Sequence, residues 1–248
     1  IPTLIQEQNS YAGITNKLLS KKAEAICVAY DNMERFFPKQ KLVLTGNPIR
    51  ETLVKPIDRT EALEYFGLNE EDKVLLIIGG SLGARSVNNA VLKNIDKIRA
   101  AGVKVIWQTG AIYYDRIMEE VKISKPDNLQ IHKFITRMDL AYAVAGLVVS
   151  RAGAGTISEL FLVGKAALLV PSPNVSEDHQ TKNAMALVDK EAALMVSDSE
   201  INEQLFPRAF ATLNNLGKCL DLSEKIKKLA KPEATKTIVD EVEKLIIE

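Results

Sequence analysis

Short, continuously apolar runs alternate with segments of helical periodicity along the whole chain, and this alternation constrains the fold most. Nine such runs stand out: Thr3–Ile5, Ala25–Ala29, Leu42–Leu44, Val74–Ile78, Val103–Trp107, Leu129–Ile131, Leu147–Val149, Ala167–Val170 and Ala193–Val196. Strands that are covered on both faces read as unbroken apolar runs, whereas half-exposed strands alternate with polar residues. The sequence therefore predicts an α/β fold, with a doubly wound parallel sheet between helices.

The segments between these runs predict helices, because their apolar residues recur with a period near 3.6. The expected helices cover residues 84–101, 111–121, 136–145, 155–163, 177–190, 203–213, 222–229 and 233–247. We expect Ser176 to cap one of them, with Glu177 and Asp178 in its first turn. Gly164 is expected to end the helix before it at a C-cap.

A proline-bearing stretch from Gly46 to Ile57 separates three of the apolar runs from the other six. Six strands suffice for a complete Rossmann-like unit, whereas three do not. We therefore expect residues 1–46 to be the C-terminal remnant of a first Rossmann-like domain and residues 47–58 to be a linker. Residues 59–248 would form the second, six-stranded domain, with the last helix as a candidate to pack back on the first domain. The first residue is Ile rather than Met, so we expect an N-terminal portion to be absent.

Composition argues against several classes of function. Among 248 residues, 32 Lys and Arg balance 32 Asp and Glu, which argues against a nucleic-acid partner. Cys27 and Cys219 form no CxxC pair and the two histidines are far apart, so we expect no metal site. No apolar stretch reaches the roughly 18 residues of a membrane span. These features fit a cytoplasmic protein without a tightly bound cofactor.

Three strand ends lead into segments suited to a ligand. Val74–Arg85 is a buried strand that enters a glycine-rich turn and a helix start, which suits either phosphate binding or close packing. It lacks both the Gly-x-Gly-x-x-Gly and the Walker pattern, and the next strand ends at Gln108–Gly110 without an acidic residue, so a hydride-transfer enzyme is disfavoured. Leu147–Leu160 has the same layout with Glu159 on the helix, and Pro171–Ala184 is rich in short polar groups. Because parallel strands end at one edge, we expect these turns to form one site.

Several segments, taken in order, resemble the MurG family of N-acetylglucosaminyltransferases. They are Glu7–Asn9 with Gly13, Gly46–Arg50, Gly79–Arg85, Phe134–Ile135 with Met138 and Ala141–Tyr142, Ser150–Glu159, and His179–Ala184. The resemblance runs from Ile1 to the last helix. It implies a GT-B architecture, in which two Rossmann-like domains face each other across a cleft and the C-terminal one holds UDP-N-acetylglucosamine.

The resemblance also implies roles for individual residues. Ser81 and its neighbouring backbone would meet the diphosphate, with Arg50 nearby, and Ile135 would contact uracil through its backbone. Gln180 and Asn9 would reach the sugar, with His179 and Asn183 as further candidates. The nucleoside would be lined by Ala154, Gly155, Thr156, Ile157, Ser158 and Glu159, with Glu159 on the ribose hydroxyls.

The family resemblance implies transfer with inversion to a lipid-linked muramyl-pentapeptide, bound by an N-terminal domain that also meets the cytoplasmic face of the bacterial membrane. Such transfer needs a base for the acceptor hydroxyl. Glu7 is a weak candidate, and a structural carboxylate is the favoured alternative. Gln6 stands where many relatives have His. Two other functions remain open: a donor-binding module without turnover, and a UDP-N-acetylglucosamine 2-epimerase.

Overall fold

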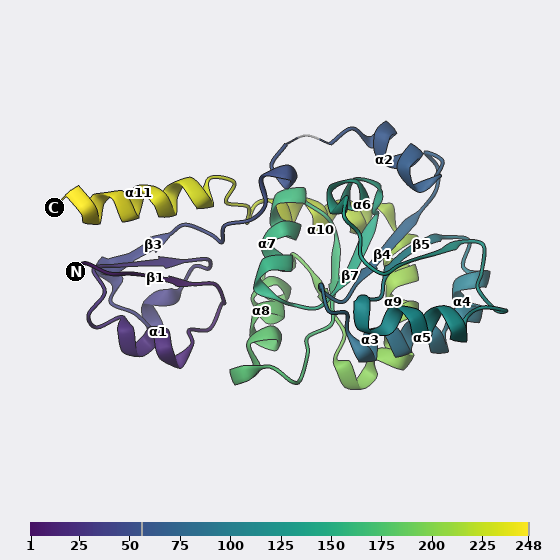
Figure 1. The fold of residues 1–248 in the computed structure, drawn as a ribbon, viewed down its shortest axis with the longest axis horizontal. Helices are drawn as coiled ribbons and strands as arrows, with labels where there is room; N and C mark the ends of the chain where they lie inside the picture. The colour runs from purple at the N-terminus through teal and green to yellow at the C-terminus, as the bar shows by residue number, and fades with distance from the viewer. Residues whose placement is uncertain (56, 248) are drawn as a thin grey trace.

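The computed structural model describes residues 1–55 and 57–247, which form two parallel sheets flanked by helices (Figure 1). The first sheet has the order β1-β2-β3, and the second has the order β6-β5-β4-β7-β8-β9. Their strands are β1 (Leu4–Glu7), β2 (Ala25–Val28), β3 (Leu42–Leu44), β4 (Val74–Ile78), β5 (Lys104–Gln108), β6 (Leu129–His132), β7 (Leu147–Ser150), β8 (Ala167–Leu169) and β9 (Leu194–Met195). All nine predicted strands are confirmed.

Most successive strands are connected by α-helices, and α9, α10 and α11 follow the last strand. They are α1 (Ile14–Leu19), α2 (Arg59–Phe66), α3 (Arg85–Lys93), α4 (Ile95–Ala100), α5 (Ala111–Glu120), α6 (Met138–Val144), α7 (Ala154–Val163), α8 (His179–Val188), α9 (Ile201–Leu213), α10 (Leu216–Lys227) and α11 (Ala234–Ile247). Short 3₁₀ turns cover Met33–Arg35, Lys39–Lys41, Glu51–Leu53, Ser176–Asp178 and Asp198–Glu200. Gly164 ends α7 in the left-handed conformation, as predicted.

Three of the expected helix boundaries are wrong. The predicted helix over 84–101 is two helices, because Asn94 leaves the helical conformation between α3 and α4. The helix expected from residue 177 begins at His179, since Glu177 and Asp178 have φ of 52° and 53° and Ser176 makes no cap bond to it. The helix expected over 222–229 begins at Leu216, where Asn215 accepts a capping bond from the Lys218 N–H.

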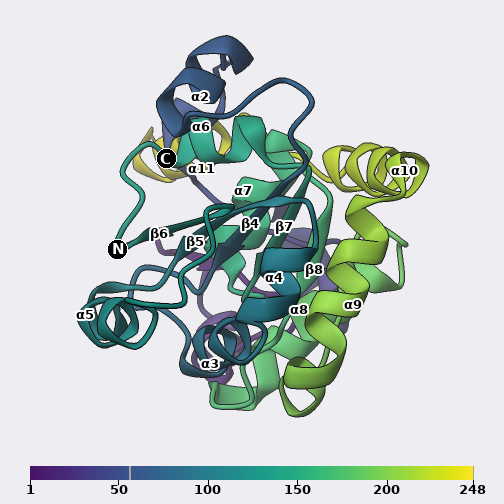
Figure 2. The ribbon, with the colours of Figure 1, turned by 90° about the vertical axis from the view of Figure 1, so that its right-hand side faces the viewer.

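The six-stranded sheet separates two apolar layers, because successive side chains of a strand point to opposite faces. Leu75 and Ile77 of β4 face the layer formed with α3, α5 and α9. Leu76 and Ile78 face the layer formed with α2, α6, α7 and α8. Figure 2 shows these helices on the two sides of the sheet. Covering both faces explains why the strands are apolar throughout.

The core of the first sheet is continuous with one of these layers. Ile26 and Val28 of β2 belong to the same buried cluster as Leu160 of α7. The rings of Tyr30 and Phe161 lie 6.3 Å apart across the junction. The start of α11 also meets the chain after β3, since a Cβ on Gly46 would lie 3.4 Å from that of Ala234. Helix α11 then runs beside the first sheet (Figure 1).

Both cysteines lie in the core. Cys27 is 0 % and Cys219 is 8 % exposed. Burial raises the pKa of the Cys27 thiol to about 11, and the Glu241 carboxylate acts in the same direction. We expect neither thiol to react with a chromogenic disulfide at about pH 8 in the native protein, because the thiolate is the reactive form. Two thiols per chain should react in guanidinium chloride, and fast labelling without denaturant would contradict this burial.

Within residues 1–55 and 57–247, no helix combines the length and the apolar character that a membrane crossing requires.

Candidate functional site

A cavity of about 550 Å³ lies at the carboxyl ends of the central strands. Strands β4 and β7 are neighbours there, and their crossovers lead to opposite sides of the sheet. In doubly wound folds such a point leaves a crevice in which ligands bind. The cavity is lined by Gly79, Gly80, Gly83, Ala84, Arg85, Ser86, Asn89, Tyr113, Arg151, Gly153, Thr156, Ser172, Asn174, Gln180 and Asp198. The three turns expected to form one site therefore do converge on one cavity.

The glycine-rich turn after β4 forms one wall because side chains have no room in it. A Cβ on Gly83 would lie 2.0 Å from the carbonyl oxygen of Thr109, and one on Gly79 would lie 2.4 Å from the amide nitrogen of Ala84. Ala84 stands at the N-cap of α3 and offers no side-chain cap, so the first N–H groups of that helix remain available. They favour an anion in the cavity. Ser81 lies exposed in this turn, beside the lining glycines.

The turn after β7 supplies a second helix start. Gly153 is the N-cap of α7, again without a side-chain cap, and Thr156 in the first turn lines the cavity. Ala154 is partly buried and Gly155 is exposed at the same helix start. Two helix N-termini thus meet one cavity, and both carry partial positive charge.

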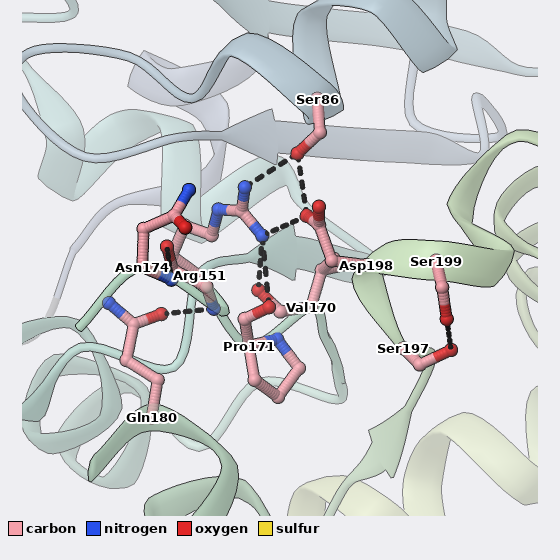
Figure 3. A network of polar contacts seen from close by, with 10 residues as sticks. Ser86, Arg151, Val170, Pro171, Asn174, Gln180, Ser197, Asp198 and Ser199 are labelled. Carbon is pink, nitrogen blue, oxygen red and sulfur yellow. Dashed lines mark hydrogen bonds and ion pairs between the residues drawn. The ribbon is translucent and has the colours of Figure 1, made fainter. Parts of the chain in front are cut away.

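Arg151 holds four segments around the cavity together (Figure 3). Its Nη1 donates to the carbonyl oxygens of Val170 and Pro171, both at 3.1 Å, and to Asp198 Oδ1 at 2.6 Å. Its Nη2 donates to Ser86 Oγ at 2.6 Å, and that hydroxyl donates to the same Asp198 oxygen. The side chain of Arg151 is 13 % exposed. Sequence reasoning missed this residue, although an arginine directly after a buried strand is a usable signal.

Arg85 gives the cavity a net positive charge. Arg151 and Asp198 offset each other, whereas Arg85 forms no ion pair within the described part of the chain. It is exposed on the first turn of α3. An anionic ligand would therefore meet one uncompensated guanidinium beside the two helix starts.

The polar segment before α8 reaches the cavity through Gln180. Its Oε1 accepts a hydrogen bond from the Ser172 N–H at 2.9 Å, which fixes the loop against the helix (Figure 3). The Nε2 amide group of Gln180, which lines the cavity, can then donate to a ligand. His179 Nε2 instead lies 3.2 Å from Glu177 Oε2, and His179 does not line the cavity. Gln180 is thus the better placed of the two candidates for a sugar contact.

Gln108 connects the glycine-rich turn to the chain after β6. It is 2 % exposed at the end of β5. Its Nε2 donates to the carbonyl oxygen of Gly80 at 3.1 Å, and its Oε1 accepts from the Ile135 N–H at 2.9 Å. The backbone N–H of Ile135 is therefore already bonded within the protein. Sequence reasoning examined Gln108 only for the absence of a carboxylate.

We expect Gln108→Met to weaken UDP binding about tenfold, because it leaves the buried Ile135 N–H unpaired and removes the hydrogen bond that ties the Gly80 carbonyl, and with it the turn that lines the cavity, to β5. Calorimetric titration of UDP measures this. The matched control is Gln130→Met on the neighbouring strand, where one hydrogen bond to Phe66 is lost away from the cavity. Equal effects of the two substitutions on UDP affinity would refute the connecting role.

Glu159 and Arg50 pair with each other outside the cavity lining. Arg50 Nη2 lies 2.8 Å from Glu159 Oε1, and the Tyr142 hydroxyl donates to Glu159 Oε2 at 2.9 Å. Burial raises the pKa of Tyr142, and the adjacent Glu159 charge adds to this, so Tyr142 stays a donor. Arg50 lines a different cavity, between residues 49–55 and 232–236. It is not among the residues that line the cavity beside the glycine-rich turn.

Two neighbours of Glu159 on α7 point into the protein. Ile157 is 0 % exposed in the core. The Ser158 hydroxyl donates to the carbonyl oxygen of Ala154 and accepts from Asn47, so it joins α7 to the chain after β3. Any ligand contact by these two would use backbone atoms.

Glu7, Asn9 and Asn183 form a polar junction between the first sheet and α8. Glu7 is 2 % exposed, and its two oxygens accept hydrogen bonds from the Asn9 N–H and side chain, the Gly13 N–H and the Asn16 side chain. Asn183 Nδ2 donates to Asn9 Oδ1 at 3.0 Å, and its own Oδ1 accepts from the Ser10 N–H. The Glu7 carboxylate thus organises a loop, which favours its structural interpretation.

Among the described residues, no group of three or more His, Cys, Asp or Glu side chains is arranged to hold a metal ion.

Comparison with known proteins shows which family has this architecture. Residues 74–241 match the glycosyltransferase family 28 C-terminal domain. A Bacteroides fragilis protein named UDP-N-acetylglucosamine--N-acetylmuramyl-(pentapeptide) pyrophosphoryl-undecaprenol N-acetylglucosamine transferase is 54 % identical over 99 % of this chain. The crystal structure of Acinetobacter baumannii MurG superposes with a TM-score of 0.77 at 32 % identity, over 98 % of this chain and 67 % of that one. The chain belongs to the MurG family.

Membership of the MurG family confirms the resemblance and the GT-B fold class. A Parabacteroides distasonis protein of the same name is 51 % identical over 99 % of this chain and 67 % of its own length. The Bacteroides fragilis relative is covered over 65 % of its length, so this chain spans about two thirds of such MurG proteins. An S. aureus MnaA–UDP structure matches with a TM-score of 0.68 at 10 % identity, which shows a common fold. The epimerase alternative is not favoured, since the sequence relatives are named transferases.

Proposed function

We propose that this chain is the donor-binding part of a glycosyltransferase that moves N-acetylglucosamine from UDP to undecaprenyl-pyrophosphoryl-N-acetylmuramyl-pentapeptide. This step converts lipid I to lipid II in peptidoglycan synthesis. The names of the MurG relatives support the reaction. One observation supports the donor assignment most directly. Two uncapped helix N-termini and Arg85, which forms no ion pair among the described residues, meet in one cavity at the switch point of the sheet.

This arrangement suits the departure of a nucleoside diphosphate. Negative charge grows on the diphosphate as the bond to the sugar breaks, and prepositioned N–H groups stabilise that charge without reorganisation. Ser81 and its turn would hold the diphosphate, and Gln180 would contact the sugar. Glu159 would accept hydrogen bonds from the ribose, which requires it to exchange its contact with Arg50 or Tyr142 for the ligand.

The acceptor would be bound by the part of such an enzyme that lies outside these 248 residues. Residues 1–46 would be the end of an acceptor domain, 47–58 its linker and 59–248 the donor domain. The lipid-linked acceptor and the cytoplasmic membrane surface would contact the acceptor domain in the full-length protein. The saturated Glu7 carboxylate favours a second, narrower function for this chain alone, in which it binds the donor but lacks the base needed for inversion.

Calorimetry with UDP-N-acetylglucosamine and a transfer assay on a lipid-linked acceptor separate these functions. Donor binding without transfer supports the binding module, and donor binding with transfer supports the enzyme. If neither UDP nor UDP-N-acetylglucosamine binds, the proposal fails in both forms.

Glu159→Ala should raise the Michaelis constant for the donor in the intact enzyme by about 10- to 150-fold, because a lost charge-assisted contact is worth about 1.5–3 kcal/mol. The same substitution in this chain should raise the Kd of UDP. Glu203→Ala on the exposed face of α9 is the control. Unchanged donor affinity in Glu159→Ala would remove this residue from the site.

A further inference from the structure

A second cavity lies at the opposite edge of the six-stranded sheet. It has a volume of about 480 Å³ and lies among the linker, the first residue of α2, the ends of α6, α7 and α10, and Lys165, which precedes β8 by two residues. These segments meet the amino ends of β7 and β8, whereas the donor cavity lies at the carboxyl ends. In Figure 1, α2 and α6 gather on the upper side of the molecule, away from the loop that precedes α8. No residue lines both cavities.

The charges around this rear cavity are all positive. Four cations line it, Lys55, Arg59, Lys165 and Lys227, and none of the described lining residues is acidic. None of the four forms an ion pair within residues 1–55 and 57–247, although the chain as a whole carries as many acids as bases. With equal numbers of acidic and basic residues in the chain, carboxylates would be expected beside these four cations. Their absence from this lining leaves the positive charge uncompensated.

Two of these cations are held close together by one backbone acceptor. Lys165 Nζ donates to the carbonyl oxygens of Ala143 and Ala145 at 3.1 and 3.0 Å. Arg59 Nη1 donates to the same Ala143 oxygen at 3.1 Å. Burial lowers the pKa of Lys165 to about 8, with a further contribution from the Arg59 charge. An ammonium has three N–H donors, so Lys165 keeps one for a ligand.

Capping of α6 accounts for only part of this arrangement. The carbonyls that Lys165 and Arg59 contact lie at the C-terminal end of that helix, where the helix dipole is equivalent to about half a negative charge. That is too little to balance four cations. Lys55 and Lys227 also make no hydrogen bond to those carbonyls, so capping does not explain their presence.

We propose that the rear cavity binds a phosphate-bearing anion, as a site separate from the donor cavity. A compact polyvalent oxyanion would neutralise several of the four cations at once, and the rigid Arg59 fork suits phosphate geometry. Leu53, Leu162 and Val163 form apolar wall, which accommodates a carbon portion of the same ligand. The phosphate group can belong to a free phosphorylated compound or to a lipid headgroup.

Inorganic pyrophosphate is the probe, titrated by calorimetry into the protein with and without saturating UDP. UDP occupies the donor cavity, so binding that persists in its presence reports the rear cavity. We expect that persistent binding to weaken about tenfold in Arg59→Ala and in Lys227→Ala, since each removes one charge contact of about 1.4 kcal/mol. Both side chains are exposed, so the variants should fold, and circular dichroism checks this. Lys97→Ala, an exposed lysine on α4, is the matched control.

The proposal is overturned if no pyrophosphate binds in the presence of UDP, or if Lys97→Ala weakens the binding as much as the cavity variants do. The UDP titration itself tests the donor site, so failure of the proposed function is recognised separately. Sedimentation with phosphatidylglycerol and phosphatidylcholine vesicles identifies the source of the phosphate. Selective binding to phosphatidylglycerol that Arg59→Ala and Lys227→Ala reduce assigns a lipid headgroup. Pyrophosphate binding without vesicle binding assigns a free phosphorylated compound.

Discussion

Gly83→Ala should destabilise the protein by more than about 4 kcal/mol and abolish UDP binding, an effect beyond that of most single substitutions. Gly83 has φ of 80°, and its Cβ would lie 2.0 Å from the Thr109 carbonyl oxygen and 3.0 Å from Tyr113 Cδ2. The oxygen belongs to backbone, so it cannot move aside as a flexible side chain would. The turn would have to leave β5, which would displace the N-terminus of α3 from the cavity. Urea unfolding and calorimetry with UDP measure the two effects.

Gly67→Ala is the control for this prediction. Gly67 also has a left-handed backbone, with φ of 59°, but a Cβ there would meet nothing within 4 Å. Its substitution should cost only the conformational strain of about 1–2 kcal/mol and leave UDP affinity unchanged. If the two variants unfold at the same urea concentration, close packing of the turn against Thr109 is not what requires glycine at position 83.

The sequence was sufficient to predict the strands and the edge of the sheet at which the cavity lies. Runs such as Val74–Ile78 are apolar at every position because helices cover both faces of the sheet. A strand covered on both faces can therefore be recognised from the residues of the strand alone. Glycines followed by a helix start then indicated two of the turns that line the cavity. The predicted helix boundaries were wrong where the backbone adopts an unusual conformation. Glu177 and Asp178 are left-handed, and no local sequence pattern indicates this.

Contacts between distant segments could not be predicted in the same way. The hydrogen bonds of Gln108 depend on the packing of β5 beside β4 and β6, which sequence periodicity does not specify. The pairing of Arg50 with Glu159 was also not indicated by the sequence, because the path of the linker determines which helix Arg50 meets. The charge of the rear cavity likewise arises from lysines and an arginine that lie far apart in the sequence.

Arg151→Met should lower the free energy of unfolding by about 2–3 kcal/mol, because breaking this partly buried ion pair leaves the Asp198 carboxylate uncompensated. Asp198 would lose its cation, and the carbonyls of Val170 and Pro171 would lose their donor. The loops after β7, β8 and β9 would then no longer be held together beside the cavity (Figure 3). Thermal and urea unfolding measure the loss.

The Arg151 variant should also bind UDP more weakly, whereas Asp198→Asn should not. Removing the Asp198 carboxylate takes one negative charge from the cavity wall, and Arg151 would keep its contacts with Val170, Pro171 and Ser86. UDP affinity in Asp198→Asn should therefore stay the same or rise, even though stability falls slightly.

This opposite response distinguishes an electrostatic contribution to ligand binding from a general loss of order. If both variants lose UDP affinity in proportion to their loss of stability, Arg151 acts on the fold alone. In the double variant Arg151→Met with Asp198→Asn, part of the lost stability should return, because the carboxylate that would lack a partner is gone.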